Sequence, residues 1–489
     1  MKTTKYIFLA LAVLLTSSCS DWLDVQPTTE KDREDLVTSA EGYKEMLYGT
    51  YINLHDAKLY GNNLSYGLLE VLARNYCNVN LGSSNNNYNF TDNKERGYFD
   101  DIWSAMYNNI ANVNSLLLDI DGHKDAFAKN EYDLCAGEAY AERAFMHFDL
   151  LRMFAPRYEG HESDIAIPYV DKYERARYPH VSEKTVVTHV LSDLDKADSL
   201  LREGNDPLVG TLQTITYNGK GNFTGNRQYR FNYWAVQALK ARVYMYVGDK
   251  ANALRYATKV INESPFRWVT ESEVAGGDMV FQSELIMGLE VPKLPDYYDA
   301  NFANSKYTLT DGWGVYGLNV FGDANDYRYL YLIGNDKNNN KVLSVKYKQD
   351  VGSSKVMKKQ TIPLMRLGEM YLIAAECQKE SNPAEAVRLL RTLRQHRGIL
   401  SEGQGIIDNP SADQIQDYVR AEMRKETYAE GQMWFYYKRV NSATTPDYSP
   451  WWAGATYSMK ESYYTFPLPE SEKEYGIIPS SSAYSSKSK

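Results

Sequence analysis

The chain has 489 residues, of which 43% are hydrophobic and 24% are charged. A chain of this length and composition can bury a large core, so it does not require disulfide bonds or metals for stability. Lys and Arg number 54 against 63 Asp and Glu, a formal net charge of -9, which argues against nucleic acid or an anionic membrane surface as the main partner. Tyr outnumbers the other aromatic residues, with 41 Tyr, 15 Phe and 8 Trp, and Tyr suits clefts and surfaces because one end of its side chain tolerates water.

The first residues have the pattern of a signal peptide. Lys2 and Lys5 precede an apolar stretch at residues 6–15, and small residues then lead to Cys19. This apolar stretch is too short to cross a bilayer as a helix. It resembles a bacterial lipoprotein signal, in which residues 1–18 are removed and Cys19 is acylated. The alternative is an ordinary secretory signal with an incidental Cys19.

Three cysteines follow Cys19, namely Cys77, Cys135 and Cys377, and none of them belongs to a CxxC motif. Because this set is odd and widely spaced, we expect three buried thiols. The alternative is one disulfide bond with a spare thiol, in a compartment where disulfides can form.

Two kinds of segment alternate along the rest of the chain. An irregular stretch at residues 76–97 is rich in Gly, Ser and Asn and carries aromatic residues; it is either a binding loop or a flexible loop with no further role. Apolar residues at helical spacing dominate most of the chain beyond this stretch. The predicted helices span residues 138–154, 185–201, 233–247, 251–262, 366–379, 383–395 and 412–425.

Small residues in two of the helix pairs have the spacing of the tetratricopeptide repeat. Such residues are required because the two helices of a repeat cross closely. The residues with this spacing are Ala241, Tyr244, Ala253 and Pro265 in the first pair, and Ala374, Cys377 and Ala386 in the second. The sequence therefore predicts scaffold helix pairs at residues 231–265 and 366–397.

Residues 267–360 differ in kind from the helical segments. Gly and aromatic residues are frequent there, short alternating runs such as residues 343–348 indicate strands, and no long helical period is present. A segment of this length is too long for a plain loop. We expect this irregular excursion to form a binding face on the helical scaffold.

No motif for catalysis is evident. The seven His lack metal-ligand spacing, and neither a nucleophile elbow nor a phosphate-binding loop occurs. Asp336, Asn338 and Asn340 begin like a calcium loop, but Lys341 and Tyr347 replace the required Gly and Glu, so a polar turn is predicted. We therefore expect no catalytic residue, no metal and no cofactor. The alternative is a surface glycoside hydrolase that uses two unrecognised carboxylates.

Several motifs, taken in order, resemble the SusD/RagB family, whose members are surface lipoproteins that capture glycans beside a TonB-dependent transporter in Bacteroidetes. The motifs are Cys19 with Trp22-Leu23-Asp24, Ala141-Glu142-Arg143-Ala144-Phe145, Ala238-Leu239-Lys240-Ala241-Arg242-Val243, Arg366-Leu367-Gly368-Glu369-Met370-Tyr371-Leu372, and Arg424-Lys425-Glu426 with Glu430-Gly431 and Trp434. The resemblance covers the length of the chain.

The resemblance implies a mostly α-helical, tetratricopeptide-like scaffold whose irregular excursion forms the binding face. It implies a signal peptide at residues 1–18, an N-terminal SusD-like region at 19–230, a C-terminal SusD/RagB region at 231–479 and a disordered tail at 480–489. It also implies a lipid-anchored protein at the outer membrane, facing the cell exterior, with a glycan ligand and a SusC-like TonB-dependent transporter as partners. The alternative is a structural lid of the transporter with no sugar site.

In this family, sugar contact comes from loops, and aromatic rings and polar groups suit the C–H faces and hydroxyls of a neutral oligosaccharide. The expected ligand-binding residues are Trp313, Tyr316, Tyr297, Tyr298, Arg74, Tyr88 and Phe90. Trp313 is the strongest candidate because Gly312 and Gly314 flank it, although a buried Trp is the alternative.

Charged residues of the C-terminal motifs have a separate, structural interpretation. Residues 366 and 369, 391 and 394, and 426 and 430 stand three or four apart. They could form ion pairs on helix surfaces, each worth about 0.2–0.5 kcal/mol. We expect them to be structural in either case.

Overall fold

Helices make up most of the fold, as the sequence predicts. The computed structural model describes residues 33–77, 79, 86–217, 223–309, 320–336, 341–401, 405–446 and 456–479. The predicted signal peptide, Cys19 and the predicted tail at 480–489 lie outside these residues. The longer helices are α3 (Ala40–Leu54), α6 (Asn93–Asp119), α7 (Glu131–Phe154), α8 (Glu183–Glu203), α9 (Tyr233–Tyr246), α10 (Lys250–Glu263), α15 (Leu367–Gln378), α16 (Pro383–Gln395), α17 (Ala412–Glu426) and α18 (Gln432–Arg439).

Short helices and strands complete the architecture. The short helices are α2 (Arg33–Leu36), α4 (Leu68–Leu72), α11 (Glu271–Ala275), α12 (Leu294–Tyr298), α14 (Tyr327–Leu332) and α19 (Glu470–Tyr475). The strands are β1 (Ile165–Pro168), β2 (His180–Ser182), β3 (Leu285–Glu290), β4 (Ile333–Asp336), β5 (Lys341–Ser344), β6 (Thr361–Arg366), β7 (Thr444–Pro446) and β8 (Thr456–Ser458). They pair as four two-stranded antiparallel ribbons, β1 with β2, β3 with β6, β4 with β5, and β7 with β8.

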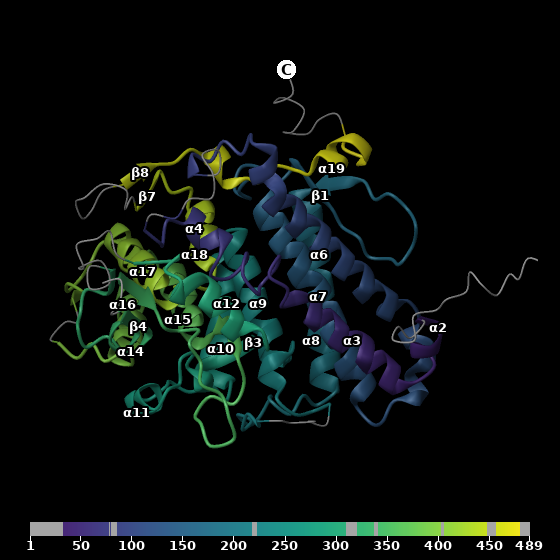
Figure 1. Cartoon of the computed structure of the whole chain (residues 1–489), viewed down its shortest axis with the longest axis horizontal. Helices are drawn as coiled ribbons and strands as arrows, with labels where there is room; N and C mark the ends of the chain where they lie inside the picture. The colour runs from purple at the N-terminus through teal and green to yellow at the C-terminus, as the bar shows by residue number, and fades with distance from the viewer. Residues whose placement is uncertain are drawn as a thin grey trace, which may run out of the picture.

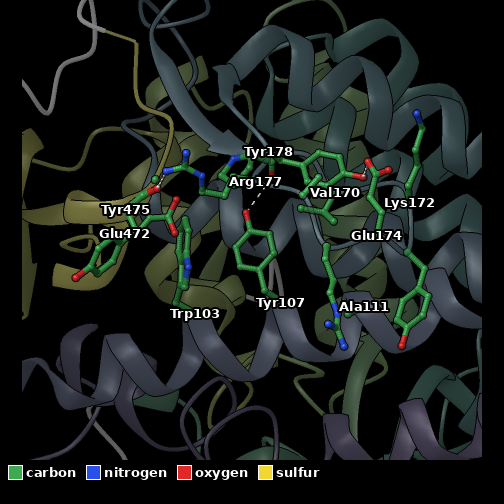
Figure 2. Close-up of a pocket in the computed structure, with 15 residues that line it drawn as sticks. Trp103, Tyr107, Ala111, Val170, Lys172, Glu174, Arg177, Tyr178, Glu472 and Tyr475 are labelled. Atoms are coloured by element: carbon green, nitrogen blue, oxygen red, sulfur yellow. Dashed lines mark hydrogen bonds between the residues drawn. The ribbon is translucent and has the colours of Figure 1, made fainter.

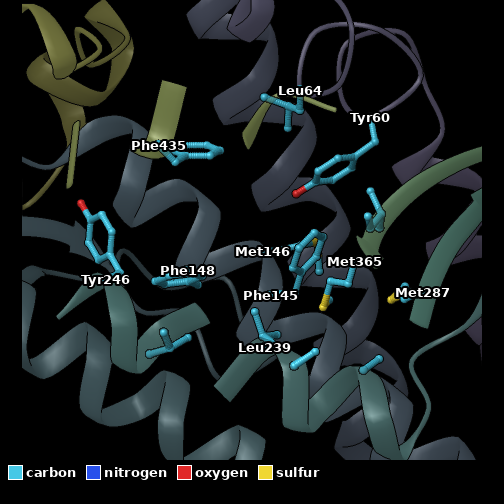
Figure 3. Close-up of a cluster of buried hydrophobic side chains, with 14 of the residues drawn as sticks. Tyr60, Leu64, Phe145, Met146, Phe148, Leu239, Tyr246, Met287, Met365 and Phe435 are labelled. Carbon is cyan, nitrogen blue, oxygen red and sulfur yellow. The ribbon is translucent and has the colours of Figure 1, made fainter. Parts of the chain in front are cut away.

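Helix α7 is the centre of the N-terminal part, where it packs on α3, α6 and α8 (Figure 1). Small residues allow this close packing: a Cβ at Gly137 would come within 2.9 Å of the Leu201 side chain on α8. Aromatic and aliphatic side chains of α7, including Phe145 and Phe148, meet α9, α18 and the β3–β6 ribbon in the main core (Figure 3). Burial of this apolar surface is the main stabilising contribution to the fold.

The two predicted helix pairs are confirmed as α9 with α10 and α15 with α16, and α10 also packs on α15. Ala241, Ala253, Ala374 and Ala386 are all fully or almost fully buried. This burial agrees with the prediction of small residues where helices cross. Pro265 follows directly after α10 and so marks its end, because Pro disfavours the helical conformation in the residue before it.

The excursion at residues 267–360 is tied to the core at both ends. Strand β3, near its start, pairs with β6, just after its end, from Leu285 opposite Arg366 to Glu290 opposite Thr361. Within it, β5 pairs with β4 in a hairpin. The alternating run predicted at 343–348 is a strand only at residues 343 and 344, and residues 346 and 347 form a turn. The residues between β4 and β5, 337–340, lie outside the described part of the chain.

Most charged residues of the predicted helix-surface pairs are buried, and only Arg391 stays half-buried, where it pairs with Asp408. Glu426 accepts hydrogen bonds from Arg328 at 2.9 Å, Arg366 at 3.1 Å and Arg397 at 2.5 Å, and all four side chains are at most 5% exposed. These three guanidinium groups come from different parts of the chain and surround one carboxylate. Arg366 also forms an ion pair with Glu430. This arrangement corrects the expectation of helix-surface pairs and confirms that the residues are structural.

The other motif charges also pair across elements. Glu369 binds Arg242 of α9, and Arg394 binds Glu422 of α17. Burial of ionised groups is tolerated only where each finds a partner. The guanidinium groups therefore hold the pKa of Glu426 well below its usual range, although burial alone would raise it.

Cys77, Cys135 and Cys377 are all buried, and each carries a thiol rather than a disulfide bond. This confirms the prediction of buried thiols. Burial raises the pKa of Cys377 to about 12, so the thiol is unreactive at neutral pH. Among the described helices, none combines the length and apolar character needed to span a bilayer.

Candidate functional site

Two of the segments that the sequence singled out meet in the structure. The backbone N–H of Cys77 donates to the carbonyl of Thr308 at 2.8 Å, and the rings of Tyr76 and Tyr307 stack at 4.7 Å. The described residues 74–77 therefore lie against residues 302–308 of the excursion. We call this contact region the loop junction.

A layer of buried aromatic rings supports the loop junction. Tyr66, Tyr76, Phe302, Tyr307 and Tyr347 lie with neighbouring ring centroids 4.7–6.5 Å apart. Tyr298 stacks on Phe302 and is only 6% exposed. Its ring is therefore part of the core, which corrects the expectation that Tyr298 displays its ring to a ligand.

Tyr88 and Phe90 are also buried, at 3% and 7% exposure. Tyr88 is flanked by the rings of Trp434 and Tyr463, and its hydroxyl donates to the carbonyl of Leu72 at 2.8 Å. Phe90 packs edge-on against Phe99. The expectation of exposed stacking rings is therefore wrong for both, because the loop turns inward and apolar surface from distant helices covers them.

Arg74 differs from these residues because it stays partly exposed. Its Nε donates to the Tyr88 hydroxyl at 3.0 Å and its Nη2 donates to the Asn86 carbonyl at 3.0 Å, while the guanidinium lies 3.9 Å from the ring centroid of Tyr457. Arg74, Tyr88 and Phe90 all have positive φ angles between 51° and 57°. Such angles are uncommon for residues other than Gly, so the surrounding contacts hold these three residues in place.

Sequence reasoning missed Tyr457 of β8, which is half-buried and covered by Arg74. The signal was the density of Tyr at residues 457–464, where three of the eight residues are Tyr. A planar guanidinium on a phenol ring offers donors at its edge and an apolar face, which together suit a sugar ring.

The remaining predicted residues belong to the excursion. Tyr297 is half-buried, and burial followed by the charge of Asp56 raises its pKa. Trp313 and Tyr316 lie outside the described residues. Leu309, the last described residue before them, donates its N–H to the carbonyl of Val342 at 2.7 Å.

The buried side chain of Glu70 links the residues after α4 to the turn before α18. Its buried carboxyl accepts hydrogen bonds from the Asn75 side chain at 2.8 Å and from the backbone N–H groups of Ala429 and Gly431 at 3.1 and 2.9 Å. Burial raises the pKa of Glu70 to about 7. These bonds fasten the N-terminal loop to the turn before α18, and Figure 1 shows α4 and α18 side by side there.

Two family models match separate parts of the chain. The model described as the SusD family matches residues 295–474, and the model described as starch-binding associating with outer membrane matches residues 21–214. The chain belongs to the SusD family. This membership confirms the resemblance found in the sequence motifs, and it places the loop junction across both matched segments.

Curated relatives cover nearly the whole chain. SusD-like protein P38 of Formosa agariphila is 24% identical over 91% of this chain and 93% of its own length. SusD-like protein P2 of the same organism is 23% identical over 90% and 91%, respectively.

Solved structures share the fold of this SusD-family chain. A SusD superfamily protein of Bacteroides thetaiotaomicron has a TM-score of 0.68 at 21% identity, covering 90% of this chain and 99% of that one. A SusD-like carbohydrate binding protein of Bacteroides vulgatus has a TM-score of 0.66 at 17% identity, covering 91% and 98%. These matches support the mostly helical fold predicted from the sequence.

Proposed function

We propose that this protein binds a glycan at the loop junction and does not turn it over. The observation that carries the proposal is the Arg74–Tyr457 stack, at 3.9 Å, three residues before Cys77, which bonds to Thr308 of the excursion. Membership in a family whose models and neighbours are described as starch-binding and carbohydrate binding supports it.

The chemistry of the loop junction fits a neutral sugar. Aromatic faces such as those of Tyr297 and Trp313 attract the C–H face of a sugar ring, and Arg74 donates to its hydroxyls. A rigid loop costs little conformational entropy on binding. The buried rings of Tyr88, Phe90 and Tyr298 contribute to this rigidity rather than to contact.

We further propose that the protein is lipid-anchored through Cys19 at the outer membrane, faces the cell exterior and delivers glycan to a SusC-like TonB-dependent transporter. The family description of association with the outer membrane supports this location. The lipid anchor would be the contact with the membrane. Each buried CH₂ of an acyl chain contributes about 0.8 kcal/mol to membrane binding, so several acyl chains suffice to hold a folded domain there.

The test is binding of the Ser20–Lys489 chain to an array of oligosaccharides, followed by calorimetry with those that bind. Trp313→Ala should weaken binding by about 2 kcal/mol, roughly thirtyfold, without lowering the melting temperature. Arg74→Lys, which keeps the charge but loses the planar stack, should also weaken binding. Tyr217→Ala removes an exposed aromatic residue elsewhere and is the matched control.

Three outcomes would contradict the proposal. If Trp313 is a core residue, Trp313→Ala should instead cost about 3–5 kcal/mol of folding stability. Normal melting together with normal binding would remove Trp313 from the site. Release of shorter sugars from a bound oligosaccharide would favour the glycoside hydrolase.

A further inference from the structure

A separate groove of about 730 Å³ lies between α6, the β1–β2 loop and α19 (Figure 2). Its floor is one face of α6, formed by Trp103, Tyr107 and Ala111 at successive helical turns. Because Ala111 is small, the floor leaves room above it. None of these residues belongs to the loop junction. We call this feature the α6 groove.

The walls of the α6 groove are held in place by hydrogen bonds. Tyr107 donates to the carbonyl of Pro168 at 2.9 Å, and Arg177 of the β1–β2 loop donates to the carbonyl of Tyr475 at 3.1 Å. His180 lies 2.9 Å from the carboxylate of Glu472 on α19. The loop and α19 are therefore joined on the far side of the groove, so its shape exists without a ligand.

Two Tyr side chains at the edge of the groove are unusually exposed. Tyr173 on the loop is 47% exposed, and Tyr475 at the end of α19 is 61% exposed. Both belong to the groove lining. Exposed aromatic rings above an aromatic floor are the surface on which sugar rings stack.

The charges of the α6 groove are unbalanced toward positive. Lys172, Arg175 and Arg177 form no ion pair with any residue of the described chain. The two lining carboxylates are already engaged, Glu174 by the Tyr178 hydroxyl at 2.9 Å and Glu472 by His180. With three cations and two carboxylates, the lining has a formal net charge of +1 in a chain of net charge -9, and this local positive balance favours an anionic ligand.

We propose that the α6 groove binds a glycan that carries carboxylate or sulfate groups. Lys172 and Arg175 bind the anionic group, and Tyr173 and Tyr475 stack on the sugar rings. The groove is a hollow of about 730 Å³, so it fits several sugar rings rather than a flat lipid surface. The proposal rests on the proposed function in that the ligand is a glycan, but it uses a different surface.

The test compares binding of three defined polymers by affinity electrophoresis and calorimetry: polygalacturonate, a sulfated galactan and a neutral galactan. The wild-type chain should bind at least one anionic polymer, and this binding should weaken as salt rises from about 0.05 to about 0.5 M because salt screens the charges. The preferred anionic polymer identifies carboxylate or sulfate as the recognised group.

Lys172→Gln/Arg175→Gln should weaken binding of that polymer about tenfold or more, which corresponds to the loss of one charge-assisted contact. Lys58→Gln/Lys355→Gln removes the same charge from exposed sites elsewhere and is the matched control. Ala111→Trp, which fills the groove and leaves its charges intact, should also weaken binding. The loop-junction variant Trp313→Ala should leave anionic binding at the groove unchanged.

Equal losses in the groove and control double variants would overturn the proposal, because binding would then follow net charge. Binding of neutral sugars without binding of either anionic polymer would overturn the proposal and leave the loop-junction function intact. Anionic binding that survives Ala111→Trp would place the ligand elsewhere. Failure of every neutral and anionic glycan would instead refute the proposed function itself, and this inference with it.

Discussion

Replacement of Glu426 by Gln tests whether the buried charge network holds the excursion to the C-terminal helices. The Glu426 carboxylate accepts from Arg328, Arg366 and Arg397, and it is 2% exposed. Gln has the same shape but no charge, and its amide nitrogen would face a guanidinium as a second donor. Three buried arginines would then share fewer acceptors.

Removal of one partner from a buried ion pair typically costs about 3–5 kcal/mol, because the remaining charge stays buried without compensation. For a chain of this size, the entropy of unfolding is about 1 kcal/mol/K, so each kcal/mol lowers the melting temperature by roughly 1 °C and a decrease of about 3–5 °C is expected. The measurement is thermal unfolding followed by circular dichroism at pH 7. The control is Glu385→Gln, which breaks an exposed pair with Arg388 and should cost less than about 0.5 kcal/mol.

The pH dependence supplies a second readout. Since the pKa of Glu426 is well below its usual range in the folded chain, its contribution is present above the unfolded value of about 4.3 and is lost as pH falls below it. The difference between wild type and Glu426→Gln should therefore be constant from pH 7 to about 5 and shrink below about 4. A melting temperature equal to that of Glu385→Gln would refute the structural role.

Three further outcomes are expected. Ala241→Leu or Ala374→Leu should lower the free energy of unfolding by about 1–3 kcal/mol, because a larger side chain overpacks a helix crossing; an unchanged melting temperature would contradict that placement. Burial raises the pKa of Glu183 to about 8, so wild type should lose more stability than Glu183→Gln as pH rises from about 5 to about 8; parallel curves in urea denaturation would refute the burial effect. Cys19→Ala should release the protein from the membrane fraction, and tight membrane association without the transporter would contradict the lipid anchor.

The sequence alone was sufficient for most helices of the scaffold. The apolar period at 138–154 and the small residues at Ala241 and Ala374 depend only on neighbours within a few positions, and a helix expresses such spacing directly. It was less informative for α6, which begins among polar residues and carries Asn at intervals. That helix is stabilised mainly by the packing of its apolar face on α3 and α7.

For the predicted site, too, the sequence predicted local features and tertiary packing decided the rest. Local composition marked residues 76–97 and 267–360 as irregular, although α6 already begins at Asn93, and the structure brings the two stretches together through Cys77 and Thr308. Whether Tyr88 or Tyr298 faces solvent was decided by helices and strands far away in the chain. Burial depends on the total area that other segments cover, and no local pattern contains that information.

The charged motif residues make the same point for electrostatics. From spacing alone, Glu426 and Arg366 have partners three or four residues away, whereas the structure pairs them with each other across 60 positions. The sequence by itself determined which residues are charged and which helices carry them. Tertiary structure alone decided the pairing, because a Coulomb interaction depends on distance in space and on removal of water, and both are set only when distant elements pack.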